Sequence, residues 1–263
     1  MVERVILTNK PLVEAIFEIK WKLQEVSPNV YTDENFNLLT GILYDNISDE
    51  YPFPVNLVPE FLPLETAPYA IRTQFRQQKD EWPLVQVGPG ILTINDTESY
   101  VWEDFENRIT HILKSLFTSF SKLKKEMRIE SLTLRYIDAL DFDYNSHDVY
   151  SYLQEQLKLN ITLTPKLFTP DFINQHPTDL NVDLMFNSKN PPGKVTLKFS
   201  TGHRKGPQGK TIPAIIWNTV FQSEINLPYD DEEDIIQWVN GAHMVTDHIF
   251  FTIIEGELLE KFR

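Results

Sequence analysis

The chain has 263 residues and no cysteine, and it also lacks a long hydrophobic run. The absence of cysteine excludes disulfides, thiolate metal ligands and a cysteine nucleophile. Nowhere do about 18 consecutive apolar residues occur, so the sequence predicts no transmembrane helix. Residues 1–11 carry none of the apolar run that a signal peptide needs. We therefore expect a cytoplasmic protein without a membrane partner.

Basic residues are in the minority. There are 24 Lys and Arg against 38 Asp and Glu, and the formal net charge is −14. Contacts with phosphates need clustered cations, and a negative field repels a polyanion. This balance disfavours nucleic acid as a partner.

The common catalytic motifs are also missing. The chain contains no Gly-x-x-x-x-Gly-Lys-Ser/Thr loop, no Gly-x-Gly-x-x-Gly, no His-Glu-x-x-His and no Gly-x-Ser-x-Gly. Nucleotide hydrolysis, dinucleotide redox chemistry, zinc proteolysis and α/β-hydrolase chemistry each lose their usual sequence support. We predict no cofactor, and the missing motifs favour a protein that is not an enzyme.

What the sequence does contain is a pattern that occurs twice. Residues 13–23 and 132–142 alternate between apolar and polar side chains, as a strand with one wet face does. A shorter amphipathic helix is predicted after each, over 32–48 and 146–162, with Thr32 and Ser146 as N-caps. Two longer helices match at a constant offset through their apolar positions: Trp102, Phe105, Ile109, Ile112, Leu116 and Phe120 with Ile235, Trp238, Ala242, Val245, Ile249 and Ile253.

Further strands are predicted between the helices of each half. A hairpin is expected over 69–76 and 82–95, and a meander over 180–186, 194–200 and 213–225. The acidic residues before both long helices, including Asp230 through Asp234, complement the positive end of a helix dipole. The final helix is expected to continue to Phe262.

These patterns predict an α+β fold with an internally duplicated strand-helix-strands-helix unit. Residues 1–126 form the first half and residues 127–263 the second, within one compact pseudo-symmetric unit. By fold-level analogy, curved antiparallel sheets pack on the long helices in a saddle-like or helix-grip-like arrangement. The helices would cover one face of the sheet and leave the other open.

Polar residues of the strands would populate the open face. They are Glu14, Glu18, Arg72, Gln74, Arg76, Arg135, Asp183, Lys194 and Lys198. Such a face is either plainly solvated or a platform for a ligand. The segment 202–210 adds glycines and cations, and is either a flap over an anionic group or an ordinary hairpin loop. The residues predicted to bind a small anionic ligand are Arg72, Arg76, Arg135, His203, Arg204, Lys205 and Lys210.

Carboxylates and aromatic residues offer weaker alternatives. Asp138, Asp141 and Asp143 near one strand end could hold Mg²⁺, although strand ends are often acidic without a metal. Tyr136, Trp217 and Phe221 either line a pocket between sheet and helices or belong to the core. His243 and His248 lie five residues apart and do not share a helix face, so each is expected to make a hydrogen bond at the edge of the core.

Four segments carry a resemblance to a known family: NKPLVEAIFEIK at 9–20, WPLVQVGPG at 82–90, LRYID at 134–138 and HMVTDHIFFTII at 243–254. Together they resemble a sporadically distributed prokaryotic family of uncharacterised proteins of similar length, which carries a provisional name. The similarity spans nearly the whole chain. The resemblance implies no activity and no catalytic residues, and the patchy distribution points to mobile or defence-associated genes.

Two hypotheses about function follow. The first is a binding or assembly module, dimeric or bound to a protein partner, that senses a small ligand through the open sheet and the segment 202–210. The second is a Mg²⁺-dependent hydrolase or nucleotide-acting enzyme that uses Asp138, Asp141 and Asp143. The missing motifs favour the first.

Overall fold

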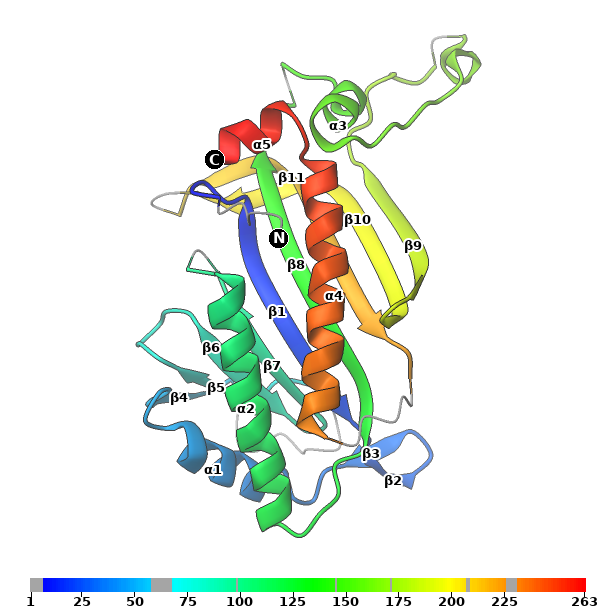
Figure 1. Ribbon diagram of the computed structural model, residues 1–263. Helices are drawn as coiled ribbons and strands as arrows, with labels where there is room; N and C mark the ends of the chain where they lie inside the picture. Colours follow the sequence, from blue (N-terminus) through cyan, green and yellow to red (C-terminus); the bar gives the residue numbers. More distant parts are fainter. Residues whose placement is uncertain are drawn as a thin grey trace.

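The computed structural model describes residues 7–57, 68–97, 99–144, 146–170, 172–206, 209–225 and 231–263. It is an α+β structure built on one antiparallel sheet of nine strands, in the order β4-β5-β6-β7-β1-β8-β11-β10-β9 (Figure 1). The two first strands of the predicted halves, β1 (Leu12–Trp21) and β8 (Ile129–Asp141), are neighbours in the middle of the sheet. Their register pairs Phe17 with Leu134.

The other strands extend the sheet to either side of this central pair. Beyond β1 lie β7 (Ile91–Asp96), β6 (Leu84–Gly88), β5 (Thr73–Arg76) and β4 (Phe53–Asn56). Beyond β8 lie β11 (Thr211–Ser223), β10 (Pro192–Lys205) and β9 (Asn181–Lys189). A separate small hairpin pairs β2 (Gln24–Ser27) with β3 (Val30–Thr32).

Two long helices, α2 (Trp102–Lys122) and α4 (Glu232–Ile253), lie against the same face of the sheet (Figure 1). The shorter helical elements are α1 (Phe36–Ile47), α3 (Val149–Leu157), the 3₁₀ turn η2 (Pro165–Phe168) and α5 (Glu257–Phe262). Within the described ranges, no helix combines the length and the apolarity needed to cross a membrane.

The core lies between this face and the two helices. Phe17 and Leu134 from the central strands pack in one buried cluster with Phe105 of α2 and Trp238 of α4. Removal of these large apolar surfaces from water is the main stabilising contribution in such a layer. The burial pattern of β1 confirms the predicted alternation, because Ala15, Phe17, Ile19 and Trp21 are buried while the residues between them are not.

On the opposite face, the alternating polar side chains bind one another. Arg135 donates to the Oδ1 of Asn218 from Nε at 3.1 Å and from Nη2 at 2.7 Å. Lys198 pairs with Asp183 at 3.0 Å. Asn95 Nδ2 donates to Glu14 Oε1 at 2.9 Å. These contacts join neighbouring strands and are those of a mutually paired polar surface.

Three predicted element boundaries were wrong. The expected strand 82–95 is a hairpin of β6 and β7, and Gly90 turns it with a φ of +77°. The segment 202–205 belongs to β10, which pairs with β11 as far as Lys205 and Thr211. The last helix stops at Ile253, and Gly256, with a φ of +99°, separates it from α5 because that backbone conformation does not continue a helix.

The predicted helix caps were also wrong. Asp148, and not Ser146, caps α3 by accepting a hydrogen bond from the backbone N–H of Ser151. Thr32 ends β3, and Asn35 is the N-cap residue of α1. The acidic first turns of α2 and α4 are present, with Glu103 in the first. Asp230 lies outside the described residues.

Candidate ligand-binding site

A cavity of about 310 Å³ lies between the sheet and the C-terminal half of α4. Its position follows from how the two long helices meet. α2 begins at Trp102, whose ring stacks on His243 of α4 with centroids 3.6 Å apart. α4 continues from His243 to Ile253 without α2 beside it, so this part of the sheet is not covered by a second long helix.

Three polar strand residues and several aromatic side chains line the cavity. Tyr136 and Asp138 come from β8, and Thr219 comes from β11, where it is the cross-strand partner of Tyr136. Most of the remaining lining is apolar and aromatic: Leu7, Pro11, Leu12, Tyr100, Trp102, Phe250 and Phe251. An apolar wall with a few convergent polar groups is the usual composition of a small-molecule site.

Asp138 is the most unusual residue of the cavity. It is 2% exposed, and its carboxyl group forms no hydrogen bond with the part of the chain that the structure describes. Burial raises the pKa of Asp138 from 3.8 to about 8, since the charged form is poorly solvated there. At neutral pH, the carboxyl group is therefore mostly protonated.

Thr219 adds a second polar group in the same situation. Its hydroxyl oxygen is buried and has no hydrogen-bond partner among the described residues. Buried polar side chains are nearly always hydrogen-bonded, and an unpaired one costs about 1–3 kcal/mol. Asp138 and Thr219 thus place two unpaired polar groups in the lining of one cavity.

A hydrogen-bonded cluster fixes the wall next to them. The Tyr136 hydroxyl lies 3.0 Å from that of Tyr100 and 3.1 Å from Nδ1 of His243. Desolvation by burial, followed by the neighbouring Tyr100, raises the pKa of Tyr136 well above its ordinary value, so it remains a neutral hydroxyl. The cluster holds the imidazole of His243 against Trp102.

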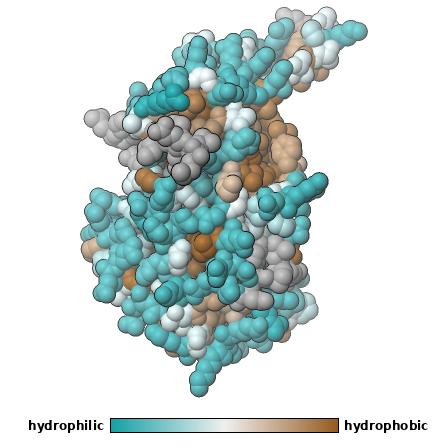
Figure 2. All heavy atoms as spheres, viewed as in Figure 1, coloured by the Kyte–Doolittle hydropathy of each residue, from teal (hydrophilic) through white to brown (hydrophobic). Residues whose placement is uncertain are grey.

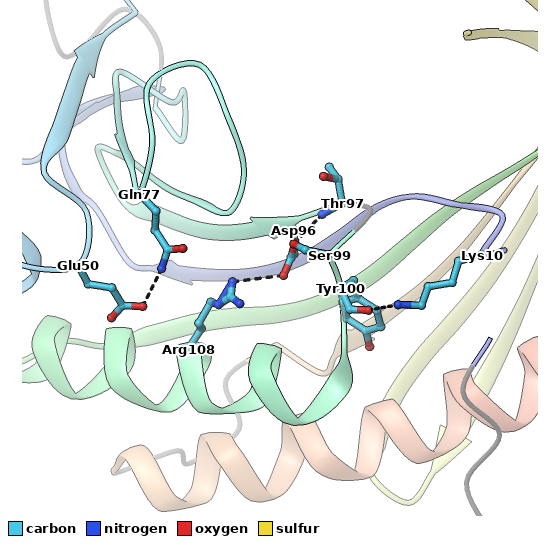
Figure 3. Close-up of polar contacts among 8 residues, drawn as sticks. All are labelled: Lys10, Glu50, Gln77, Asp96, Thr97, Ser99, Tyr100 and Arg108. Atoms are coloured by element: carbon cyan, nitrogen blue, oxygen red, sulfur yellow. Dashed lines mark hydrogen bonds and ion pairs between the residues drawn. The ribbon is translucent and has the colours of Figure 1, made fainter. Parts of the chain in front are cut away.

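Charged groups surround the cavity as well. Glu103 and Asp247 contribute carboxylates, and Lys10 contributes an ammonium group. Lys10 Nζ donates to the backbone carbonyl of Tyr100 (Figure 3). Glu103 and Asp247 both take part in further interactions of their own. Acidic groups therefore outnumber cationic ones around the cavity.

A second buried aspartate, Asp96, lies at the end of β7, where the chain leaves the sheet and leads into α2. Asp96 is fully buried, and its Oδ1 accepts hydrogen bonds at 2.8 Å from the backbone N–H of Thr97 and from the hydroxyl of Ser99 (Figure 3). Its Oδ2 forms an ion pair with Arg108 of α2 at 3.3 Å. Asp96 thus ties the end of β7 to α2, and its role is structural.

The structure does not bring the predicted anion-binding residues together. Arg76 and Arg135 lie in one row across the sheet, but four strand spacings separate them, roughly 19 Å at about 4.8 Å per strand. Arg72 is only 9% exposed. One small ligand cannot touch both Arg76 and Arg135.

The remaining predicted residues lie at the far end of the β10–β11 hairpin. His203, Lys205 and Lys210 are exposed there. Arg204 Nε and Nη2 contact the two carboxylate oxygens of Asp141 at 2.5 and 3.0 Å, and this hydrogen bonding raises the pKa of Arg204. Its charge is already compensated, and anion binding at this hairpin stays a prediction.

Of the three aspartates predicted as Mg²⁺ ligands, Asp138 and Asp141 lie in different surroundings. Asp138 points into the cavity lining, whereas Asp141 is bound to Arg204 on the exposed side. In the described ranges, no three His, Asp or Glu side chains are grouped so that they could hold a metal ion.

Sequence reasoning named part of this site and missed the rest. Tyr136, Trp217 and Phe221 were predicted either to line a pocket or to belong to the core. Tyr136 lines the cavity, whereas Trp217 and Phe221, which are 1% and 0% exposed, belong to the core. Asp138 was predicted only as a possible Mg²⁺ ligand, although its inward position in the series Leu132, Leu134, Tyr136, Asp138 and Leu140 indicates a buried carboxyl group. A carboxylate at such a position needs an explanation.

Comparison with known proteins assigns no role to these residues. No protein-family model matches the chain. No curated protein matches it either. The chemistry of the cavity is therefore the basis for the function proposed below.

Proposed function

We propose that the protein is a binding module that takes up a small ligand in the cavity between α4 and the sheet. The observation that carries this proposal is the presence of Asp138 and Thr219 in the cavity lining, both buried and both unpaired within the described residues. A ligand that supplies their partners would remove the desolvation penalty of both groups. This free energy is gained only when the ligand is bound, so it contributes directly to affinity.

The placement of the three aspartates favours binding over the alternative of a Mg²⁺-dependent hydrolase. Asp138 lies in the cavity between α4 and the sheet, and the Asp141 carboxylate is bound by Arg204. The enzyme hypothesis needs these groups around one metal ion. The binding hypothesis needs only the cavity.

The proposal includes the finer parts of the predicted fold. We infer a duplicated, pseudo-symmetric chain with halves 1–126 and 127–263. It is supported by the pairing of β1 with β7 and of β8 with β11, and by the long helix that follows each set of strands. A cytoplasmic location and a defence-associated role belong to the same proposal.

Native mass spectrometry of the protein purified from its own host tests the binding function. We expect a retained small molecule of defined mass in the natural protein. A Thr219→Phe variant, which places a large ring in the cavity, should lose it, whereas the control Thr196→Phe on the opposite face of the sheet should keep it. A protein that carries nothing, and whose melting temperature responds to no compound in a metabolite library, would contradict the proposal.

A second candidate function is self-association, favoured by exposed apolar side chains on the edge strand β9 and on the segment that precedes it. They are Leu163, Leu167, Phe172, Ile173, Met185 and Phe186, with Phe172 87% exposed. Apolar surface is visible in Figure 2 where the projecting segment around α3 meets the rest of the molecule. Such surface and an unpaired strand edge are typical of an interface, and the partner we propose is a second copy of the chain.

Light scattering after size-exclusion chromatography measures this directly. We expect a dimer that Phe172→Ser or Phe186→Ser converts to a monomer. Phe53→Ser on the opposite edge strand β4 is the matched control, since Phe53 is 43% exposed. A monomer at all concentrations would contradict self-association.

A further inference from the structure

The cavity also indicates what kind of ligand it takes, an inference that rests on the proposed binding function. We propose that the ligand is a protonated amine carried on an aromatic or apolar body, with its ammonium group at Asp138. The carboxyl group of Asp138 and the hydroxyl of Thr219 offer oxygen acceptors, and neither is occupied by a described residue. An ammonium group has only donors and needs several acceptors around it.

The aromatic lining fits the same ligand. Tyr100, Trp102, Phe250 and Phe251 contribute rings to the cavity. The faces of aromatic rings attract cations, and this attraction grows in a desolvated site. The same rings also bury an apolar body by the hydrophobic effect. An anionic ligand would gain nothing from the ring faces and would be repelled by Asp138 once that group ionises.

The balance of charge around Asp138 favours a cation. The charged or titratable groups that face the cavity are Glu103 from α2, His243 and Asp247 from α4, and Lys10 from the segment before β1, together with the phenols of Tyr100 and Tyr136. Three carboxyl groups thus face one lysine and one histidine. The Lys10 ammonium is hydrogen-bonded to the Tyr100 carbonyl. An incoming ammonium group adds positive charge to a set in which carboxyl groups outnumber cationic groups.

Recognition of an amine should be coupled to a proton. Since the carboxyl group of Asp138 is mostly protonated at pH 7, an arriving ammonium favours the ionised form, and one proton leaves the carboxyl group for the solvent. Binding then becomes tighter as the pH rises towards 8, and levels off once Asp138 is already ionised in the free protein. A neutral ligand would release no proton.

Isothermal titration calorimetry with three probes of similar shape tests this inference. The probes are 2-phenylethylamine, 2-phenylethanol and 3-phenylpropanoate. We expect the amine to bind at least about tenfold more tightly than the alcohol, which corresponds to one charge-assisted hydrogen bond, and the carboxylate to bind most weakly. Titrations in buffers of different ionisation enthalpy should show close to one proton released per amine at pH 7.

Two variants locate the effect. Asp138→Asn keeps the size of the side chain and should remove both the preference for the amine and the proton release. Glu18→Gln, on the opposite face of the sheet, also removes one carboxylate and should change neither. If the amine binds equally well to Asp138→Asn, the assignment of the ammonium group to Asp138 is overturned.

The outcomes separate this inference from the binding function itself. If the alcohol or the carboxylate binds the natural protein as tightly as the amine, the ligand class is wrong and the cavity remains a binding site. A neutral or anionic compound retained in native mass spectrometry leads to the same conclusion. If no probe binds and no compound is retained, both proposals are wrong.

Discussion

Two aspartates are buried within the part of the chain that the structure describes, and their surroundings differ. Asp96 ends β7 and receives two hydrogen bonds and an ion pair from its surroundings. Asp138 lies in β8, and among the described residues nothing donates to it. A buried carboxylate with partners contributes to the architecture. One without partners lowers the stability of the fold when it is ionised, which agrees with the ligand-binding role proposed for Asp138.

The largest effect is expected at the paired aspartate. Asp96→Ala removes the partner of Arg108, whose side chain is 17% exposed. Loss of one member of a buried ion pair costs about 3–5 kcal/mol, because the other charge is left without compensation. Urea denaturation should show this loss of unfolding free energy. The double variant Asp96→Ala with Arg108→Met should recover part of it, and a single variant with wild-type stability would remove the contrast between the two aspartates.

At the unpaired aspartate, Asp138, substitution should raise the unfolding free energy instead of lowering it, and the size of this change should depend on pH. The pKa of Asp138 is about 8 in the folded protein and near 3.8 when unfolded, so between these values only the folded protein holds the proton. Each pH unit in this window therefore lowers the unfolding free energy by up to about 1.4 kcal/mol. Below pH 3.8 the penalty disappears.

Replacement by a neutral side chain isolates this contribution. Asp138→Asn should be more stable than the natural protein at pH 7, and the difference between the two should shrink as the pH falls towards 4. Thermal or urea unfolding of both proteins at several pH values measures it. If the stabilities of the two proteins changed with pH in parallel across this range, Asp138 would ionise normally, and its contrast with Asp96 would be wrong.

The contrast between the aspartates also shows how far the sequence leads. Alternation in 13–23 and 132–142 predicted the central strands, and apolar spacing predicted both long helices, because these patterns reflect burial against one layer. The sequence could not predict that α2 begins beside His243, so that α4 alone covers the sheet at the cavity. It could not tell Asp96 from Asp138 either, since the partners of Asp96 depend on how β7 meets α2.

Some errors came from turns. The segment 82–95 was predicted to be one strand, whereas Gly90, with a φ of +77°, turns the chain between β6 and β7. The basic segment 202–210 was interpreted as a loop because it contains three glycines. Its first part is strand, since pairing with β11 satisfies the backbone there.

Two hydroxyl groups of the cavity differ in the same way as the two aspartates, with smaller expected changes in unfolding free energy. The Tyr136 hydroxyl has Tyr100 and His243 as partners, whereas that of Thr219 has none among the described residues. Tyr136→Phe should lower the unfolding free energy by about 1 kcal/mol, because it leaves both partners without their shared hydroxyl. Thr219→Val, which removes an unpaired group of similar size, should be neutral or slightly stabilising. Equal losses in the two variants would show that Thr219 has a partner in solution.

The smallest effect is expected where a carboxylate is paired but exposed. Asp141 binds Arg204 through both oxygens, yet the two side chains are 55% and 34% exposed. Water and salt screen such a pair, so Arg204→Ala should cost less than about 1 kcal/mol, and less still at high ionic strength. Urea denaturation at low and high salt measures this. A loss as large as that of Asp96→Ala would mean that pairing alone, irrespective of burial, decides what an aspartate contributes here. A small loss leaves burial as the variable that separates Asp141 from Asp96, and the lack of a partner as the one that separates Asp138 from both.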